Sequence, residues 1–258
     1  GASPANTVGV TALGILYAYN LVPYQPYRDA CETAANLIET NVGSGQRIRG
    51  PDITFLVELS EATHASSYAE LAATGWQAAL DDYTSSQTAT EFAEYIYDVR
   101  AGQGIGELSV WDINLYVVGL SALDRYFPEA GYGAQAVEMA NVANTIMADV
   151  EETDTYYALA LTGAIATYAQ TGQYTSDIPS LTAALMSLCS PDGSIEGVQT
   201  TAYALMALVR SGTPASSLTS MLEYLASART VEGGWMDAEG EYTEADSEVL
   251  QALNMVLQ

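Results

Sequence analysis

The chain has 258 residues and a formal net charge of −25, and 49% of its residues are hydrophobic. This length and composition suffice for a large buried core. All seven basic residues are arginine, and we expect no binding to nucleic acid or an anionic membrane surface, because phosphate binding needs clustered Lys or Arg. The chain has no run of about 20 apolar residues, so no membrane insertion is expected. Its start, Gly-Ala-Ser-Pro-Ala, has no Met and no signal-like segment, which is typical of a processed chain.

Helical periodicity fills the chain, and the alternation typical of strands is scarce. One group of segments is apolar on nearly every side, as expected for helices buried on most sides. In chain order these segments are 8–19, 52–59, 113–123, 155–168, 201–209 and 247–257. Amphipathic segments alternate with them at 27–40, 89–99, 134–148, 178–188 and 216–227, and an extra helix is expected at 66–83. The sequence therefore predicts an all-α protein with a single domain over residues 1–258.

A polar residue marks the start of each apolar segment. These residues are Asn6, Asp52, Asp112, Asp154, Thr201 and Asp246. We predict that they are N-caps, which satisfy unpaired backbone N–H groups for about 1 kcal/mol each. Their positions define a unit of about 45 residues that recurs six times. Six such units predict an inner ring of helices wrapped by an outer ring, with an open superhelical solenoid as the alternative.

A second repeated frame follows the amphipathic segments. Its fullest copy is Tyr224-Leu225 … Arg229 … Gly233-Gly234-Trp235. Three weaker copies keep the same offsets, and they are Asn36-Leu37 … Asn41 … Gly45-Gln46-Arg47, Tyr95-Ile96 … Arg100 … Gly104-Ile105-Gly106 and Ala184-Leu185 … Cys189 … Gly193-Ser194-Ile195.

This frame resembles the QW-type repeat of the squalene-cyclase and protein-prenyltransferase superfamily, the terpenoid cyclase-like proteins. In that repeat an aromatic-aliphatic pair is followed by Gln, Gly and Trp. Residues 224–235 match it, except that Arg229 stands where Gln is usual. The resemblance implies an (α/α)6 toroid of six inner and about six outer helices. It also implies that the frame fastens helices together, so it says little about activity.

The connectors from amphipathic to apolar segments are mostly long and rich in glycine. In a ring of parallel inner helices they would share one face with the positive N-terminal ends of those helices. Ligand-binding groups usually lie on loops held by a rigid scaffold, so we expect a site at this ring mouth. The candidate catalytic residues are Asp52, Asp112, Asp154 and Asp246. The candidate ligand-binding residues are Arg47, Arg49, Trp111, Glu196, Trp235 and Tyr242, with Asp237 nearby.

Each candidate has a structural alternative. The aspartates are predicted N-caps first, and they would serve as general acid and base only where they converge on a cavity. Trp235 is expected to pack as the fastener of the repeat, whereas Trp111 is open to packing or to stacking on a ligand. Arg47 and Arg49 either neutralise the aspartates or clamp the carboxylate of an anionic ligand.

The catalytic motifs of the resembled enzymes are missing. No Asp-x-Asp-Asp run exists, and Asp81-Asp82-Tyr83-Thr84-Ser85 lacks the last Asp of Asp-Asp-x-x-Asp. Zinc needs three or four converging ligands, and His64 is expected on the face opposite to Cys189, with Cys31 midway along another helix. We therefore expect no metal and no cofactor. Both cysteines are expected to act as small buried hydrophobes that do not meet.

Three classes of function remain. The favoured one is an extracellular or cell-surface module for binding or interaction, with a glycan or another small ligand at the mouth. The second is a carbohydrate-active hydrolase or lyase that uses mouth carboxylates, and the third is a self-associating subunit of a surface layer or filament. A Lys-free chain rich in Ser, Thr and Tyr is typical of an exported protein, and its 18 tyrosines suit half-buried positions and ligand rims.

Overall fold

The computed structural model describes residues 8–237, 240–241 and 243–257. These residues form twelve α-helices, one 3-10 helix (Ala215–Ser217) and a ribbon of two antiparallel strands, and the predicted all-α class is confirmed. The helices are α1 (Val8–Leu21), α2 (Gln25–Gly43), α3 (Gly50–Thr63), α4 (Ser66–Tyr83), α5 (Ala89–Ala101), α6 (Leu108–Tyr126), α7 (Tyr132–Met147), α8 (Tyr157–Thr171), α9 (Ile178–Ser187), α10 (Val198–Arg210), α11 (Thr219–Ser227) and α12 (Thr243–Leu257). The strands are β1 (Met236–Asp237) and β2 (Gly240–Glu241).

Every helix predicted from the sequence is present, and the extra one is α4 with the expected bounds. The largest difference is at the start of α6, which begins at Leu108 instead of 113. The turn before it already has helical spacing, since the N–H of Ser109 donates to the carbonyl of Gly106 at 3.1 Å. The chain therefore enters α6 directly from the glycine turn, one turn earlier than the apolar pattern predicts.

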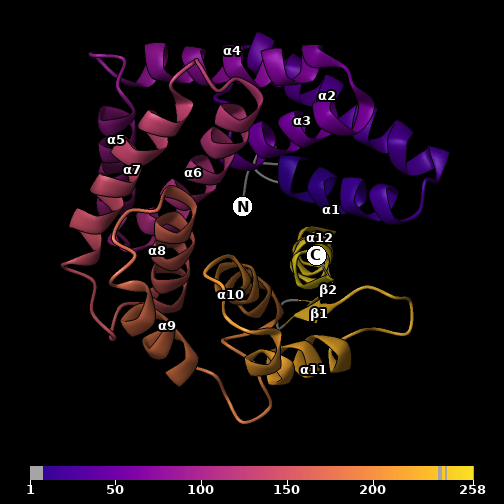
Figure 1. The fold of residues 1–258 in the computed structure, drawn as a ribbon, viewed down its shortest axis with the longest axis vertical. Coiled ribbons are helices and arrows are strands. Elements are labelled where there is room, and N and C mark those ends of the chain that lie inside the picture. Colours follow the sequence, from indigo (N-terminus) through magenta and orange to yellow (C-terminus); the bar gives the residue numbers. More distant parts are fainter. Residues whose placement is uncertain (1–7, 238–239, 242, 258) are drawn as a thin grey trace.

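Six helices contact one another in a closed cycle. α1 packs on α3, α3 on α6, α6 on α8, α8 on α10, α10 on α12, and α12 on α1. These helices are the six segments that the sequence predicts to be apolar on nearly every side. Of the other helices, α2 packs on α1, α4 on α3, α7 on α6 and α8, α9 on α8, and α11 on α10. Figure 1 shows α4 along the upper edge, α5 and α7 at the left, and α11 at the lower edge.

The buried apolar side chains form two clusters. One is built mainly from α1 to α7, and the other from α8 to α12. α8 contributes to both, with Ala160, Ala164 and Tyr168 in the first cluster and Leu161 and Ile165 in the second. The core therefore continues from the N-terminal to the C-terminal half of the chain through α8.

Glycines allow the helices of the cycle to approach closely. A Cβ on Gly50, at the start of α3, would overlap the carbonyl group of Leu115 in α6. A Cβ on Gly163 of α8 would come within 2.8 Å of the carbonyl oxygen of Val110 in α6. The distances from these two Cβ positions, 2.3 Å to the carbonyl carbon of Leu115 and 2.8 Å to the carbonyl oxygen of Val110, are too short for a real Cβ. Only glycine therefore fits at these contacts without a shift of the backbone.

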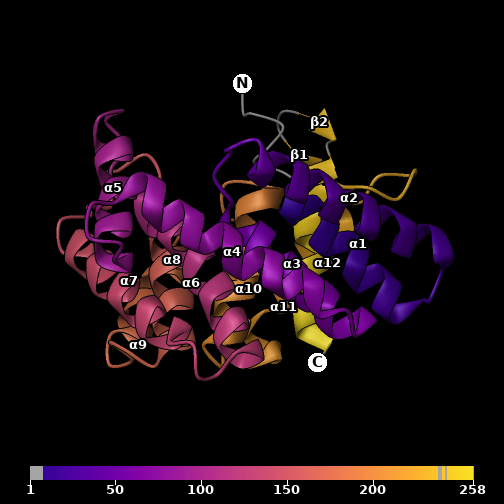
Figure 2. The ribbon, with the colours of Figure 1, turned by 90° about the horizontal axis from the view of Figure 1, so that it is seen from above.

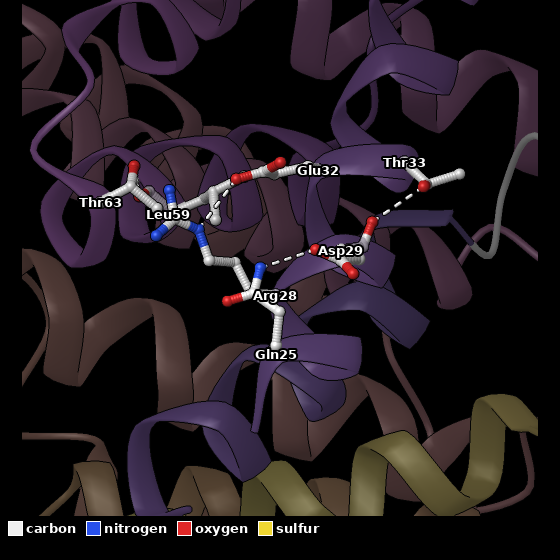
Figure 3. Close-up of polar contacts among 7 residues, drawn as sticks. All are labelled: Gln25, Arg28, Asp29, Glu32, Thr33, Leu59 and Thr63. Carbon is white, nitrogen blue, oxygen red and sulfur yellow. Dashed lines mark hydrogen bonds and ion pairs between the residues drawn. The ribbon is translucent and has the colours of Figure 1, made fainter. Parts of the chain in front are cut away.

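The outer helix α2 shows how the amphipathic segments are built. Its solvent-facing side has polar contacts one helical turn apart, in which Gln25 donates to Asp29 at 2.7 Å and Arg28 donates to Glu32 at 2.9 Å (Figure 3). Such pairs contribute only a few tenths of a kcal/mol each. The opposite face is buried, and its buried side chains are Cys31, Ala35 and Ile38. Burial of this face is therefore the main contribution that holds α2 on the inner helices.

The prediction that the aspartates are N-caps is wrong. The N-cap residues are Arg49 in α3, Glu107 in α6, Tyr156 in α8 and Gly197 in α10. Asp52, Thr201 and Asp246 lie inside the first turns of their helices, Asp112 lies in the second turn of α6, and Asp154 lies before α8. Asn6 lies outside the described residues. α3, α6, α10 and α12 start two to five residues earlier than predicted, whereas α8 starts two residues later.

Four of these polar side chains anchor the connector that precedes their helix. Asp154 accepts a hydrogen bond from the N–H of Glu151 at 2.8 Å, and Asp246 accepts one from the N–H of Trp235 at 2.6 Å. In the same way, Thr201 accepts from the N–H of Ile195 at 2.9 Å, and Asp52 accepts from the N–H of Arg49 at 3.0 Å. Asp112 is the exception, since its carboxylate pairs with the Arg100 side chain. The contact of Asp112 is therefore with a side chain of α5 and not with the backbone of a connector.

Trp235 acts as a fastener between α11 and α12. Its side chain is only 7% exposed, and its indole N–H donates to the carbonyl of Leu225 at 2.7 Å. Its backbone N–H binds Asp246 of α12, and an isolated β-bridge joins it to Arg229. One residue therefore connects the end of α11, the connector and the start of α12.

Candidate functional site

The N-terminal halves of the six cycle helices line a cavity of about 480 Å³, which we call the mouth cavity. Its wall includes Val10 of α1, Pro51 of α3, Asp112 of α6, Leu159 of α8, Gln199 of α10 and Glu244 of α12. Cavities of this size are typical of small-molecule sites. Figure 2 shows the β1–β2 ribbon, which precedes α12, at the upper edge of the molecule, with the C-terminal end of α12 at the lower edge.

The connector from α2 to α3 supplies two arginines to the cavity, Arg47 and Arg49. Arg49 has an extended backbone with φ −104° and ψ 156°, and alternate residues of an extended segment point to the same side. Ile48 between them is 1% exposed. The hydroxyl of Tyr116 in α6 donates to the carbonyl of Ile48 at 3.0 Å. The Arg-Ile-Arg sequence therefore buries its middle residue and directs its two cations into the cavity.

Three aromatic rings hold the guanidinium of Arg47. Its central carbon lies 5.2 Å from the ring centroid of Tyr83, 5.5 Å from that of Tyr95 and 5.7 Å from that of Phe92. Contacts of this kind contribute roughly 0.5–1 kcal/mol at partly exposed sites. The rings leave the N–H groups of Arg47 without a carboxylate partner among the described residues.

Two charged side chains that line the cavity beside Arg47 and Arg49, Arg100 and Asp112, form an ion pair. Arg100 donates from Nε to Asp112 Oδ2 at 2.5 Å, and both side chains are about one-quarter to one-third exposed. Arg49, by contrast, has no side-chain acceptor within hydrogen-bonding distance among the residues that the structure describes. Burial raises the pKa of the Asp52 carboxyl to about 6, and the hydrogen bonds from the N–H groups of Arg49 and Gly9 and the charge of the Arg49 side chain lower it.

The floor of the mouth cavity is an aromatic pair. The rings of Trp111 in α6 and Tyr203 in α10 have centroids 4.1 Å apart and planes tilted by 50°. Both residues also line a second, deeper cavity of about 80 Å³. The pair therefore lies between the mouth cavity and the interior of the helix cycle.

The deeper cavity is lined with polar groups that the sequence does not single out. They include Tyr17 of α1, Glu58 of α3, Asn114 of α6 and Arg210 of α10. Burial raises the pKa of Tyr17 and of Glu58 and lowers the pKa of Arg210. The side-chain oxygen of Asn114, which is 2% exposed, has no hydrogen-bond partner among the described residues. An unsatisfied buried acceptor costs about 1–3 kcal/mol, so we expect water in this cavity.

The structure brings together four of the candidate site residues. Arg47, Arg49, Trp111 and Asp112 all line the mouth cavity. Asp52 lies beside Arg49 and is 5% exposed. Burial raises the pKa of Tyr116 to about 12, and the charges of Arg47 and Arg49 lower it.

Among the candidates whose side chains the structure describes, Asp154, Glu196, Trp235 and Asp246 do not line this cavity. Asp154, Asp246 and Trp235 take part in the connector contacts described above. Glu196 lies in the connector before α10 with φ 58°, and burial raises the pKa of its carboxyl. Tyr242 lies outside the described residues, and Asp237 belongs to β1.

Five polar residues of the mouth cavity are not among the residues predicted from the sequence: Arg100, Tyr116, Gln199, Tyr203 and Glu244. Arg100 could have been found, because it holds the same position of the repeated frame as Arg229. Tyr203 lies in the segment 201–209, which the sequence predicts only as an apolar helix, and Gln199 lies in the connector before that segment. Their position on the inner side of α10 depends on how that helix is rotated, which a nearly uniform apolar pattern does not determine.

Metal-ligating residues are dispersed. Among residues 8–237, 240–241 and 243–257, no group of three or more His, Cys, Asp and Glu side chains is arranged to hold a metal ion. Cys31 is buried, Cys189 is half-buried, and both are free thiols. His64 ends α3 in a left-handed conformation with φ 58°. In the same described part of the chain, no helix is long and apolar enough to span a membrane.

Comparisons of the chain with protein-family models, with curated proteins and with solved structures find no match.

Proposed function

We propose that the chain is an (α/α)6 toroid related to the terpenoid cyclase-like proteins and that it binds a small ligand in its mouth cavity. The closed cycle of contacts from α1 through α12 supports the toroid, with α2, α4, α5, α7, α9 and α11 as the outer helices. Trp235, which ends the fullest copy of the repeated frame, fastens two helices as the QW-type repeat would. An extracellular or cell-surface location belongs to this proposal and rests on the acidic, Lys-free composition.

The observation that carries the binding function is the mouth cavity itself. It combines about 480 Å³ of space, an aromatic floor and several charged and polar side chains that converge from separate helices. Ligand sites usually combine apolar and aromatic walls with polar groups that orient the ligand. The absence of a recognisable catalytic motif in the sequence favours binding over reaction.

A thermal-shift screen of glycans, corrinoids, isoprenoids and aromatic acids would test this proposal. We expect at least one compound to raise the melting temperature of the wild-type protein, because a ligand that binds only the folded state stabilises it. Leu115 lines the cavity, so Leu115→Trp should fill it and abolish the shift. Leu37→Trp adds the same bulk on the outer helix α2, where Leu37 is 48% exposed, and should leave the shift intact. An equal loss in both variants would contradict a mouth site.

A carbohydrate-active hydrolase or lyase is the second candidate, and one observation favours it. Burial raises the pKa of Glu244, as suits a general acid. Asp112, held by its contact with Arg100, supplies the second carboxylate that a base or nucleophile requires. Both carboxylates line the mouth cavity. Release of reducing ends from a polysaccharide panel would test this activity. It should disappear in Glu244→Gln and persist in Glu94→Gln, which changes an exposed residue of α5.

A further inference from the structure

We infer that the ligand of the mouth cavity is a small organic monoanion, with a carboxylate that binds Arg49 and Arg47 and a planar apolar body that packs on Trp111 and Tyr203. This inference rests on the proposed binding function and adds the chemical class of the ligand. It begins from the distribution of cations. Three of the seven arginines of a chain with net charge −25 line this one cavity.

The pairing of these arginines determines where an anion would bind. Arg100 is already neutralised by Asp112. Arg47 is held by the rings of Tyr83, Tyr95 and Phe92, which orient its guanidinium but accept no hydrogen bond from it in the plane of the group. Arg49 has no side-chain acceptor among the described residues. The two unsatisfied guanidinium groups come from alternate positions of one extended connector, so they face the same side.

The connector that carries them is rigid at its middle. Ile48 is buried and its carbonyl accepts a hydrogen bond from Tyr116. Gly50, the next residue but one, lies directly against the backbone of α6. A guanidinium held in place loses little freedom when it binds a carboxylate, and its planar fork matches the two carboxylate oxygens. Arg47 and Arg49 therefore form a site arranged in advance for an anion.

The charges of the cavity wall favour one negative charge on the ligand. The described side chains on the wall include three arginines and two carboxylates, Asp112 and Glu244. They leave an excess of one positive charge. The buried carboxyl of Asp52 lies beside Arg49 and reduces this excess further when it is ionised. A ligand with two or more negative charges would face these carboxylates without a matching cation.

The aromatic floor indicates the rest of the ligand. Trp111 and Tyr203 present ring surface to the same cavity that holds Arg47 and Arg49. Ring surfaces favour planar apolar groups through stacking and burial. A carboxylate attached to a flat ring system would therefore satisfy the arginines and the floor together.

Calorimetric titration with three related probes tests the inference. The probes are 2-naphthoate, its neutral amide 2-naphthamide and the dianion 2-naphthyl phosphate at a pH where it is doubly charged. We expect naphthoate to bind at least tenfold more tightly than either of the others. Arg49→Gln should reduce naphthoate affinity at least tenfold and leave the weaker binding of the amide unchanged.

Arg28→Gln is the matched control, because Arg28 lies on α2, pairs with Glu32 and does not line the cavity. Arg28→Gln removes the same charge as Arg49→Gln but outside the cavity. It should therefore change naphthoate affinity by less than twofold. Equal affinity of naphthoate and naphthamide would overturn the requirement for an anion while leaving a ligand site in the cavity intact. Tighter binding of the phosphate would overturn the monoanion, and an equal loss in Arg28→Gln would overturn the assignment to Arg49. If no probe binds, the inference is wrong, and the broader thermal-shift screen decides separately whether the cavity binds any ligand.

Discussion

Arg47 and Trp235 hold the same position of the repeated frame, at the end of Gly45-Gln46-Arg47 and of Gly233-Gly234-Trp235. Trp235 turns inward, fills space between α11 and α12 and donates its indole N–H to Leu225. Arg47 is half-buried, rests on three rings and lines the mouth cavity. The backbone frame is thus common to both connectors, and the last residue of the frame decides whether the connector fastens helices or presents a charged group to the cavity.

The two connectors also differ in which residue is held by the aspartate of the following helix. Next to Trp235, the N–H of the terminal residue binds Asp246 directly. Next to Arg47, the fastening contacts shift along the chain, since Asp52 binds the N–H of Arg49 and also the N–H of Gly9 in α1 at 2.9 Å. Asp52 therefore anchors both its own connector and the neighbouring helix. Arg47 is released from a structural role by this arrangement.

Truncation of Trp235 and of Arg47 to alanine tests the two roles most directly. Trp235→Ala should lower the free energy of unfolding by about 3–5 kcal/mol, as expected for a large buried aromatic residue. Arg47→Ala should cost about 1 kcal/mol or less, because it removes only partly exposed cation–π contacts. Denaturant unfolding followed by circular dichroism measures both values. Trp235→Phe should fall between them, since it keeps a ring and loses the N–H bond to Leu225. Equal costs for the two alanine variants would refute the division of roles.

The anchoring carboxylate gives a pH-dependent test. Burial raises the pKa of Asp52 to about 6 in the folded protein, and an unfolded aspartate titrates near 3.9. The folded state therefore binds more protons between these values, so this group adds stability as the pH falls through 6, up to about 3 kcal/mol near pH 4. Asp52→Asn should lack this gain.

Many carboxylates titrate over the same range, so the measured quantity is a difference between variants. We expect the stability of wild type relative to Asp52→Asn to rise as the pH falls from 7.5 to 4. Asp98→Asn, which removes one exposed charge from α5, should show no comparable trend relative to wild type. If the stability difference between wild type and Asp52→Asn does not change with pH, the Asp52 carboxyl is solvated like that of an exposed aspartate.

A third test changes the backbone contact beneath Arg47 and Arg49. Gly50→Ala adds a Cβ that overlaps the backbone of Leu115, and overpacking of this kind typically costs about 1–3 kcal/mol. Gly43→Ala is the matched control, because nothing lies within 4 Å of the added atom at the end of α2. Thermal unfolding of the two variants should differ clearly. The Gly50→Ala variant should also weaken naphthoate binding, since the connector must move away from α6.

The sequence predicts much of this architecture because the signals for it are local. Apolar segments repeated every 45 residues locate the inner helices, and the segment 66–83 coincides with α4. The cap assignments fail for a physical reason: Asp52 and Asp246 satisfy N–H groups of connectors, and a sequence pattern does not distinguish those from the N–H groups of a helix start.

The candidate site is less accessible from sequence. Arg47, Arg49, Trp111 and Asp112 could be placed near one another because they lie at the starts of two inner segments. Tyr203 could not, because its contact with Trp111 joins α6 to α10 across the cavity. Such long-range contacts depend on the rotation of each helix about its axis and on the distances between helices. A uniformly apolar sequence pattern predicts neither of them.

The smallest effect is expected from the two arginines that share the middle position of the frame. Arg100 pairs with Asp112 in a setting that is only partly exposed, whereas the side chain of Arg229 is exposed and donates to the carbonyl of Gly233 at 3.4 Å. Arg100→Gln should cost about 0.5–1 kcal/mol, and Arg229→Gln should change stability by about half a kcal/mol or less. The Arg100 effect should shrink at high salt, because screening weakens an ion pair near the surface. A salt-independent loss in Arg100→Gln would mean that its side chain stabilises the protein through packing and not through the ion pair with Asp112.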